Sequence, residues 1–399
     1  MSNVYKQSSA HCSTNHHFIY RIFSMKYPNS ILQFFSLLRA GLWNSEVDSG
    51  IFASSVNWKE LLLLANYQTV SGIVFDGLQQ LKGIKCDRST LMEWVVVVKR
   101  IEDTNLQLNH ALAYLVYRYK EAALNPVILK GQAVAGYYTN PLHRISGDID
   151  LYFSYGYSKA NDVLKRFPGA KENEATIYHK SFNVGGISIE NHLQFVDFYS
   201  PKNKKAWELA LTAMDVEKYE TQEFYGKNGK VVEVSVFSPQ VNAIYLFLHL
   251  QHHLLQTGIG LRQVCDWACL WKAREQEIDK ALFLKIVDML PVRRSMTALA
   301  WIVENHLGLS TGIIPLDTST AQAREDGEFL LEDIMTGGNF GRGFGFMDGF
   351  IRNKHLHNLK TYMMAMKRML KIRRLCPSEV DAYIRYWILE KLNIKPMKE

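Results

Sequence analysis

Two aspartates on one short alternating segment constrain this chain more than any other feature. The segment is residues 148–153, DIDLYF, in which every second side chain from position 149 is apolar, and this alternation predicts a β-strand. Side chains two apart on a strand point to the same face, so Asp148 and Asp150 should project together, opposite the apolar set. Adjacent carboxylates repel each other unless a cation lies between them, and such hard oxygen ligands suit Mg²⁺ or Mn²⁺.

The segment before this strand has the layout of a phosphate-binding turn. Residues 127–129 are apolar and predict a strand, Lys130 and Gly131 follow, and a helix-compatible run comes next. A glycine just after a strand lets the backbone approach a ligand closely, and the amides at a helix start favour phosphate. Arg144, four residues before the first aspartate, would add a planar positive fork for a phosphate. The alternative is a surface turn in which Arg144 is the counter-ion of two solvated aspartates.

Together these motifs resemble the nucleotidyltransferase superfamily of DNA polymerase β, and within it the branch called uncharacterised nucleotidyltransferases. That superfamily has a Gly-containing turn, a helix, and then a strand with two aspartates that bind metal. The resemblance implies that Gly131 is the turn, that Asp148 and Asp150 are catalytic metal ligands, and that Lys130 and Ser146 bind nucleotide with Arg144. The wider superfamily has Gly-Ser at the turn, where this chain has the Lys-Gly form of its own branch.

A predicted hairpin supplies the third carboxylate of the resemblance. Residues 176–184 and 187–195 flank a Gly-Gly turn, and their alternation predicts two antiparallel strands. Glu190 and His192 share one face of the second strand. Taken alone, that polar face would indicate an exposed edge strand. Because the corresponding strand of the family carries an acid and, two positions later, a histidine, the resemblance implies that Glu190 is a metal ligand or base. His192 belongs either to the nucleotide site or to the structure alone.

Helical patterns occupy both sides of this core. We expect a leader at residues 1–30, a helical region at 31–124, a nucleotidyltransferase core at 125–238, and a C-terminal helical region with a basic tail at 239–399. Within the core, further helices are predicted at 158–167 and 207–215, and a closing strand at 231–237. The predicted fold class is therefore α+β, with a small mixed β-sheet flanked by helices.

The first part of the C-terminal region contains polar side chains that would suit a nucleotide site. The helix expected at 241–255 carries His249 and His253 one turn apart, a spacing compatible with zinc, but it lacks the Glu of HExxH and so excludes that metalloprotease motif. Arg262 and Asp266 follow, four residues apart. They either pair on a helix surface or lie on a face that closes over the nucleotide, with Arg262 near the phosphates.

Two later segments are biased towards glycine and towards basic residues. Residues 337–345 predict a flexible loop, with a lid as the alternative, and they do not form a GxGxxG motif after a strand. The last forty residues hold ten Lys and Arg against four Asp and Glu, which is +6 of the chain's net +7. Five of these basic residues fall between 367 and 374, on a helix that would either bind RNA or present a solvated face.

The cysteine spacing and the apolar runs indicate the cellular compartment of the protein. The five cysteines are mostly far apart and form no CxxC, so the chain of 399 residues predicts neither a disulfide framework nor a zinc ribbon. The N-terminus lacks the layout of a signal peptide, and no apolar run approaches the ~20 residues of a membrane span. We therefore expect a cytoplasmic protein without a membrane span.

These observations predict a magnesium-dependent (or manganese-dependent) nucleotidyltransferase. Asp148, Asp150 and Glu190 would hold the ions, an NTP would be the substrate, and a nucleoside monophosphate would pass to an acceptor hydroxyl with release of pyrophosphate. The acceptor could be protein, RNA or a small molecule, and the base preference and oligomeric state stay open. The alternatives are a degenerate nucleotide-binding regulatory protein, against which the intact acids argue, and an RNA-binding scaffold that uses the basic tail.

Overall fold

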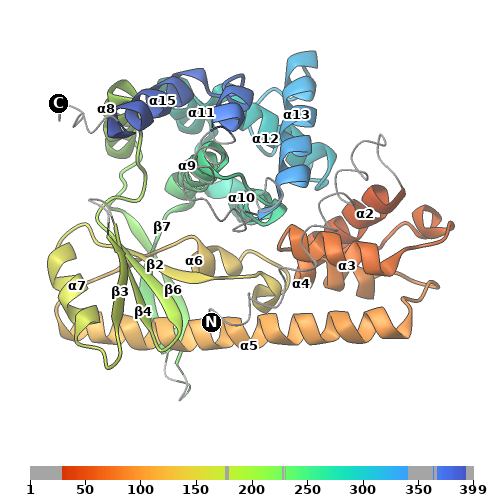
Figure 1. Cartoon of the computed structure of the whole chain (residues 1–399), viewed down its shortest axis with the longest axis horizontal. Coiled ribbons are helices and arrows are strands. Elements are labelled where there is room, and N and C mark those ends of the chain that lie inside the picture. The colour runs from red at the N-terminus through yellow and green to blue at the C-terminus, as the bar shows by residue number, and fades with distance from the viewer. Residues whose placement is uncertain are drawn as a thin grey trace.

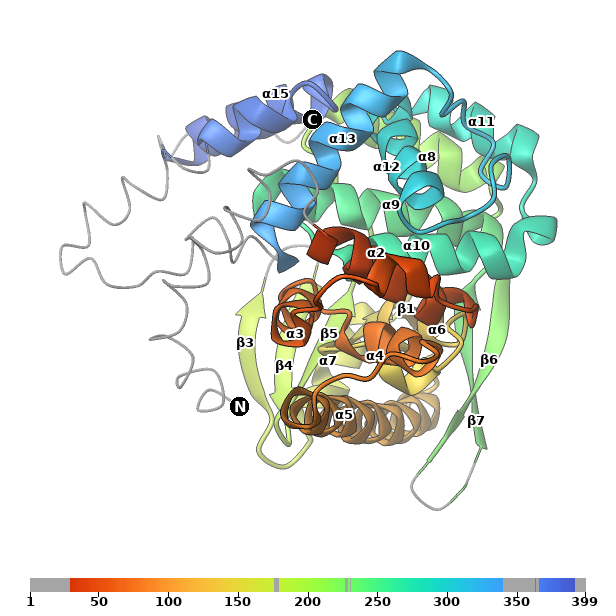
Figure 2. The same ribbon diagram turned by 90° about the vertical axis from the view of Figure 1, so that its right-hand side faces the viewer.

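A mixed β-sheet forms the centre of the molecule, with helices on both faces. The computed structural model describes residues 29–175, 179–226, 229, 231–339, 363 and 366–391. Within these residues the long helix α5 (Arg88–Glu121) runs under one face of the sheet, and the helices of the C-terminal half cover the other (Figure 1). The view turned by 90° shows the same layers, with α5 below and α9 and α10 above (Figure 2). The predicted α+β class is confirmed.

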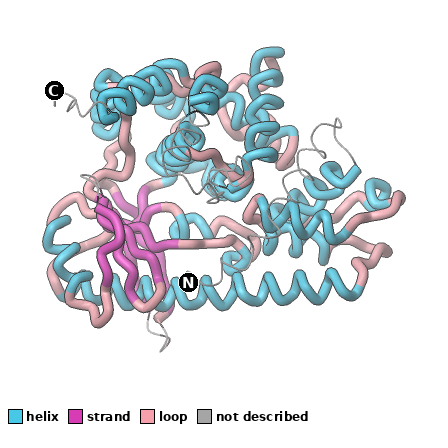
Figure 3. Tube along the Cα trace, in the orientation of Figure 1, coloured by secondary structure: helices cyan, strands magenta, loops and turns pink. Residues whose placement is uncertain are grey.

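Among the described residues, the sheet has seven strands in the order β3-β4-β5-β2-β1-β7-β6. Their bounds are β1 Val127–Leu129, β2 Asp148–Tyr152, β3 Lys171–Ala175, β4 His179–Val184, β5 Ile187–His192, β6 Tyr219–Tyr225 and β7 Val231–Phe237. β2 pairs in parallel with β5 and antiparallel with β1, and β1 pairs in parallel with β7. The predicted strands at 127–129, 148–153 and 231–237 and the predicted hairpin are present, whereas the two edge strands β3 and β6 were not predicted. Figure 3 shows the sheet surrounded by helices.

Alternation along β2 gives its two faces different surroundings. Ile149 and Leu151 are fully buried and belong to an apolar cluster with α5 and α7 (Tyr157–Lys165). The carboxylates at 148 and 150 project from the opposite face, which α9 (Pro239–Gln256) covers. Burial of the apolar face against α5 therefore fixes which way the two acids point.

The helices at the two ends of the chain share one core. The N-terminal helices are α2 Asn29–Trp43, α3 Trp58–Tyr67 and α4 Ser71–Gln79, and the short turns are η2 Ser49–Phe52, η3 Pro141–His143 and η4 Glu275–Glu277. The remaining helices are α6 Gly131–Ala135, α8 Pro201–Ala213, α10 Leu261–Arg274, α11 Lys280–Met289, α12 Arg293–Asn305, α13 Ala321–Gly337 and α15 Pro377–Lys391. A single apolar cluster has members from Ile31 to Val380. The two predicted helical regions thus pack against each other in one core.

Helices α2 and α4 approach each other closely because each has a glycine at their crossing point. A Cβ added at Gly77 would lie 1.8 Å from the Leu37 carbonyl oxygen, and one added at Gly41 would lie 1.8 Å from that of Ile73. Neither position has room for a side chain, so the pair sets the distance between the two helices.

Two predictions fall partly or wholly outside the described residues. The leader at 1–30 is described only from residue 29, and the glycine-rich stretch at 337–345 only as far as 339. Among the helices that the structure does describe, none combines the length and apolar character needed to cross a membrane.

Candidate active site

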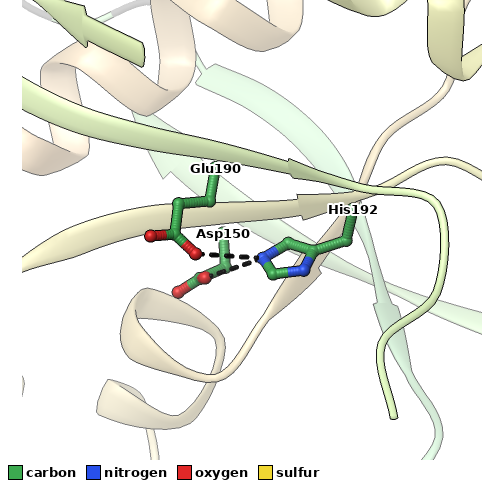
Figure 4. Close-up of side chains that lie close together, drawn as sticks. All are labelled: Asp150, Glu190 and His192. Atoms are coloured by element: carbon green, nitrogen blue, oxygen red, sulfur yellow. Dashed lines mark hydrogen bonds and ion pairs between the residues drawn. The ribbon is translucent and has the colours of Figure 1, made fainter. Parts of the chain in front are cut away.

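The parallel pairing of β2 with β5 brings two of the three predicted acids, Asp150 and Glu190, together, whereas Asp148 lies opposite Ser188. Asp150 lies opposite Glu190 in the register, and Figure 4 shows these two side chains and His192 pointing toward one another. The His192 Nε2 atom is 3.0 Å from Asp150 Oδ1 and 3.5 Å from Glu190 Oε2. One ligand atom from each residue falls within 4.8 Å of the others, a spacing that could hold a metal ion. His192, which we had expected to bind nucleotide or to be structural, therefore lies in the metal-compatible group.

Lys130 provides a positive charge beside the two aspartates of β2. Its Nζ atom is 3.1 Å from Asp150 Oδ2 and 4.0 Å from Asp148 Oδ2. The backbone turns sharply here, since Lys130 has φ +38° and Gly131 has φ +45° directly after β1. A positive φ is unfavourable for a lysine, and such strain persists only where the surroundings impose it. The turn aims the ammonium group at the carboxylates.

Asp150 is ionised in this environment. The residue is 1% exposed, and burial alone would raise the pKa of its carboxyl group, but Lys130 and then His192 lower that pKa to about 2. Its Oδ2 atom is buried and ion-paired with the Lys130 ammonium group at 3.1 Å. A carboxylate oxygen has a second lone pair beside the one that faces an ammonium group, so the oxygens of Asp150 and Glu190 could bind a divalent cation.

A pocket with a cavity of about 220 Å³ opens beside Asp148. Its wall includes five of the six residues predicted to bind nucleotide: Lys130, Gly131, Arg144, Ser146 and Arg262. Thr69, Gln263 and Asn339, which sequence reasoning missed, add neutral polar groups to the wall. Gln263 directly follows Arg262 and Asn339 belongs to the glycine-rich stretch, but no pattern in the sequence marks these three side chains as part of a nucleotide site. The fold thus gathers the predicted nucleotide residues around one pocket, with His192 outside it.

Arg144 is buried in the pocket wall, and the N–H groups along one edge of its guanidinium group pair with Asp266 of α10. Its Nε and Nη2 atoms donate to the two Asp266 carboxylate oxygens at 2.9 and 2.6 Å. Its Nη1 atom donates to Ser146 Oγ at 2.9 Å, and Tyr138 donates its hydroxyl hydrogen to Asp266 at 2.6 Å. The sequence interpretations did not include this partner, which lies 122 positions away. Most of the Arg144 donors are therefore already used inside the protein.

Arg262 also lines the pocket but has no acidic partner. Its Nη1 atom donates to the Ile145 carbonyl oxygen at 2.8 Å, whereas its buried Nε atom has no acceptor. Among the described residues it forms no ion pair, since Asp266 pairs with Arg144. Burial and then the charge of Arg144 lower the pKa of Arg262. Asp266 therefore neutralises Arg144 but not Arg262, which leaves an excess of positive charge in the pocket wall.

Comparison with known proteins identifies the family. A family model described as uncharacterised nucleotidyltransferase matches residues 54–308, well over half of the chain. The chain belongs to the uncharacterised nucleotidyltransferase family. No curated protein and no solved structure matches it. The matched range contains every predicted site residue, and it supports a general role in nucleotidyl transfer.

Three histidines on α9 lie close to the pocket. His249 lines it and places its Nε2 atom 3.2 Å from that of His253. Burial lowers the pKa of His253 to about 3 and that of His252 to about 4, so both are neutral at physiological pH. In the described part of the chain, no third histidine, cysteine or acid joins His249 and His253 at metal-binding spacing. The two histidines, whose spacing is compatible with zinc, therefore lack the further ligands that a zinc site needs among the described residues.

Proposed function

We propose that the chain is a divalent-metal-dependent enzyme that transfers a nucleoside monophosphate from an NTP to an acceptor hydroxyl. The observation that carries this proposal is the convergence of acids from β2 and β5 beside a positively charged pocket. The proposed metal ligands are Asp148, Asp150 and Glu190, with His192 held against two of them. A bound Mg²⁺ or Mn²⁺ would neutralise phosphate charge and lower the pKa of the acceptor hydroxyl.

The pocket residues would have different roles in binding the triphosphate. Lys130 and Arg262 supply positive charge, and Gly131 lets the backbone come close to the phosphates. Arg144 and Ser146 shape the loop before β2, since Asp266 holds the guanidinium group and that group holds the serine hydroxyl. Arg144 thus contributes mainly by fixing the pocket wall, and at most one of its N–H groups is left for a phosphate.

His192 orients the acids rather than the nucleotide. Its Nε2 atom lies between Asp150 and Glu190, so a hydrogen bond from this nitrogen fixes the direction of the Asp150 carboxylate. A carboxylate held in one orientation is a better-organised ligand than a freely rotating one. The acceptor, whether protein, RNA or small molecule, and the cytoplasmic location remain predictions.

The RNA-binding alternative finds less support, because the basic cluster before α15 is engaged inside the fold. Arg368 pairs with Asp333 at 2.9 Å and is 5% exposed. Lys371 pairs with the same carboxylate, and Arg374 pairs with Asp326. These contacts neutralise charge that an RNA phosphate would otherwise meet.

Labelled NTPs test the proposal directly. The purified chain is incubated with Mg²⁺, a cell lysate, and NTPs that carry the label on either the α- or the γ-phosphate. Nucleotidyl transfer should label a macromolecule or small molecule from the α-position and not from the γ-position. Replacing Asp148 and Asp150 by Asn, or Glu190 by Gln, should abolish labelling while circular dichroism shows an intact fold. Full labelling by these variants would refute the assignment.

A further inference from the structure

His143 lies between two carboxylates just before the loop that forms the pocket wall. It is the last residue of η3, and it is 5% exposed. Its Nδ1 atom is 2.7 Å from Asp76 Oδ1 on α4, and its Nε2 atom is 3.2 Å from Glu102 Oε1 on α5. Both ring nitrogens therefore face an acid that comes from the N-terminal helical region.

The number of protons on His143 decides whether both contacts can form. An ionised carboxylate only accepts hydrogen bonds, and a neutral imidazole has only one N–H group. Asp76 and Glu102 can both be satisfied only by the imidazolium form. Burial alone would lower the pKa of His143, but the hydrogen bonds and charges of these two acids outweigh it and raise that pKa above 6.5. Lys99, behind Glu102, is the remaining charge that contacts this acid.

The backbone around His143 is held from the same two helices. Asn105 of α5 donates from Nδ2 to the carbonyl oxygens of Leu142 and Arg144, at 2.7 and 2.8 Å. On the α4 side, a Cβ added at Gly72 would lie 2.4 Å from the His143 carbonyl oxygen. The segment is thus fixed on both sides immediately before the residues that line the pocket.

We propose that His143 is a positioning residue. Its imidazolium ring, hydrogen-bonded to an acid at each nitrogen, holds residues 141–147 in the shape that binds NTP. The inference rests on the proposed function, because this loop would form one wall of the nucleotide site. As the pH rises through the pKa of His143, one of the two hydrogen bonds is lost and its acid faces an unprotonated nitrogen. The loop then loosens, and NTP affinity falls.

Hydrogen exchange of residues 141–147 measures the loop without nucleotide, and calorimetry with a non-hydrolysable NTP analogue and Mg²⁺ measures the affinity. Both are followed from about pH 6 to about pH 9, the range in which a histidine with a raised pKa changes charge. In the parent, exchange corrected for its intrinsic pH dependence should speed up and affinity should fall as the pH rises. His143→Gln should show the loosened loop and about tenfold weaker binding already at the low end, the effect of one lost charge-assisted hydrogen bond.

Two further variants separate positioning from general damage. His110→Gln removes another histidine, on α5 and away from the loop, and should match the parent throughout. Glu102→Gln supplies an amide that can donate to the neutral imidazole, so it should keep the loop ordered and flatten the pH dependence. A parent whose loop exchange and affinity do not change with pH, or a His143→Gln protein that behaves like His110→Gln, would overturn the inference. If the loop becomes more ordered at low pH but the protein binds no NTP, the role of His143 in holding the loop would be established and the proposed function would be rejected.

Discussion

Replacing Lys130 by Met should destabilise the protein by about 2–3 kcal/mol. Its ammonium group is 3.1 Å from an oxygen of Asp150, which is 1% exposed. Removing one partner of a buried ion pair costs about 3–5 kcal/mol, because the other charge stays buried. The cost here should be at or just below the lower end of that range, about 2–3 kcal/mol, since His192 still bonds the carboxylate and the Lys130 side chain is 18% exposed.

Divalent cations should recover much of that loss. A ligand present at one hundred times its dissociation constant stabilises the folded state by about 2.7 kcal/mol. In Lys130→Met the carboxylates have lost the competing ammonium group, so Mg²⁺ should stabilise the variant more than it stabilises the parent. Urea unfolding with and without Mg²⁺ gives both free energies. Equal stabilisation of the two proteins by Mg²⁺ would refute the assignment of this carboxylate group as a metal site.

An exposed lysine supplies the matched control for this experiment. Lys165 pairs with Asp162 at 3.4 Å, with side chains 50% and 60% exposed. Surface pairs of this kind contribute about 0–1 kcal/mol, so Lys165→Met should leave both the stability and its response to Mg²⁺ unchanged. A loss comparable to that in Lys130→Met would show that the effect is not specific to the site.

Acid unfolding provides an independent measurement of the same ion pair. The pKa of Asp150 is lowered from 3.8 to about 2 in the folded protein, where Lys130 and His192 outweigh burial. A group with a lowered folded-state pKa contributes stability that is complete above its unfolded pKa and is lost as the pH falls through the folded one. The parent should therefore lose stability from about pH 4 towards about pH 2. In Lys130→Met this loss should be smaller, because the cation that contributes most to the low pKa is gone.

Two other substitutions test the pocket and the helical packing. Arg262→Met should weaken NTP binding about tenfold, measured by calorimetry, because it removes a guanidinium group that pairs with no acid among the described residues. Arg262→Lys should recover part of the affinity. Unchanged binding in the Met variant would show that Arg262 is not part of the site. Gly77→Ala should lower the free energy of unfolding by about 1–3 kcal/mol, since its Cβ would lie 1.8 Å from the Leu37 carbonyl oxygen and must push α2 away from α4; a melting temperature equal to that of the parent would contradict this packing.

The sheet shows which strands a sequence pattern can reveal. The buried strand β1 and the strands β2 and β7 have apolar runs or clear alternation, and each was predicted. The unpredicted strands are β3, with the sequence KENEA, and β6, with the sequence YETQEFY. Both lie at the edges of the sheet, where charged side chains are common because they discourage pairing with other chains. Edge strands therefore lack the apolar pattern from which a strand is normally predicted.

The contacts that assemble the site could not be predicted for a different reason. Asp148, Asp150 and Glu190 stand out because local alternation and the family resemblance both mark them. The pairing of Arg144 with Asp266, by contrast, joins residues 122 positions apart, and that of His143 with Asp76 joins residues 67 apart. Such long-range polar pairs depend on how the helices pack, and neither partner has a local pattern that indicates the other.

The position of the pocket loop links these contacts to function. Its first residues are held by α4 and α5, through Asp76 and Glu102, and its middle is held by α10, through Asp266 and Arg262. The N-terminal and C-terminal helical regions thus form hydrogen bonds to the same short loop from opposite sides. Since the loop leads directly into β2, a shift of either helical region moves the pocket wall relative to the carboxylates. Substitutions at these contacts should therefore change nucleotide affinity even though the side chains concerned do not reach the proposed metal ligands.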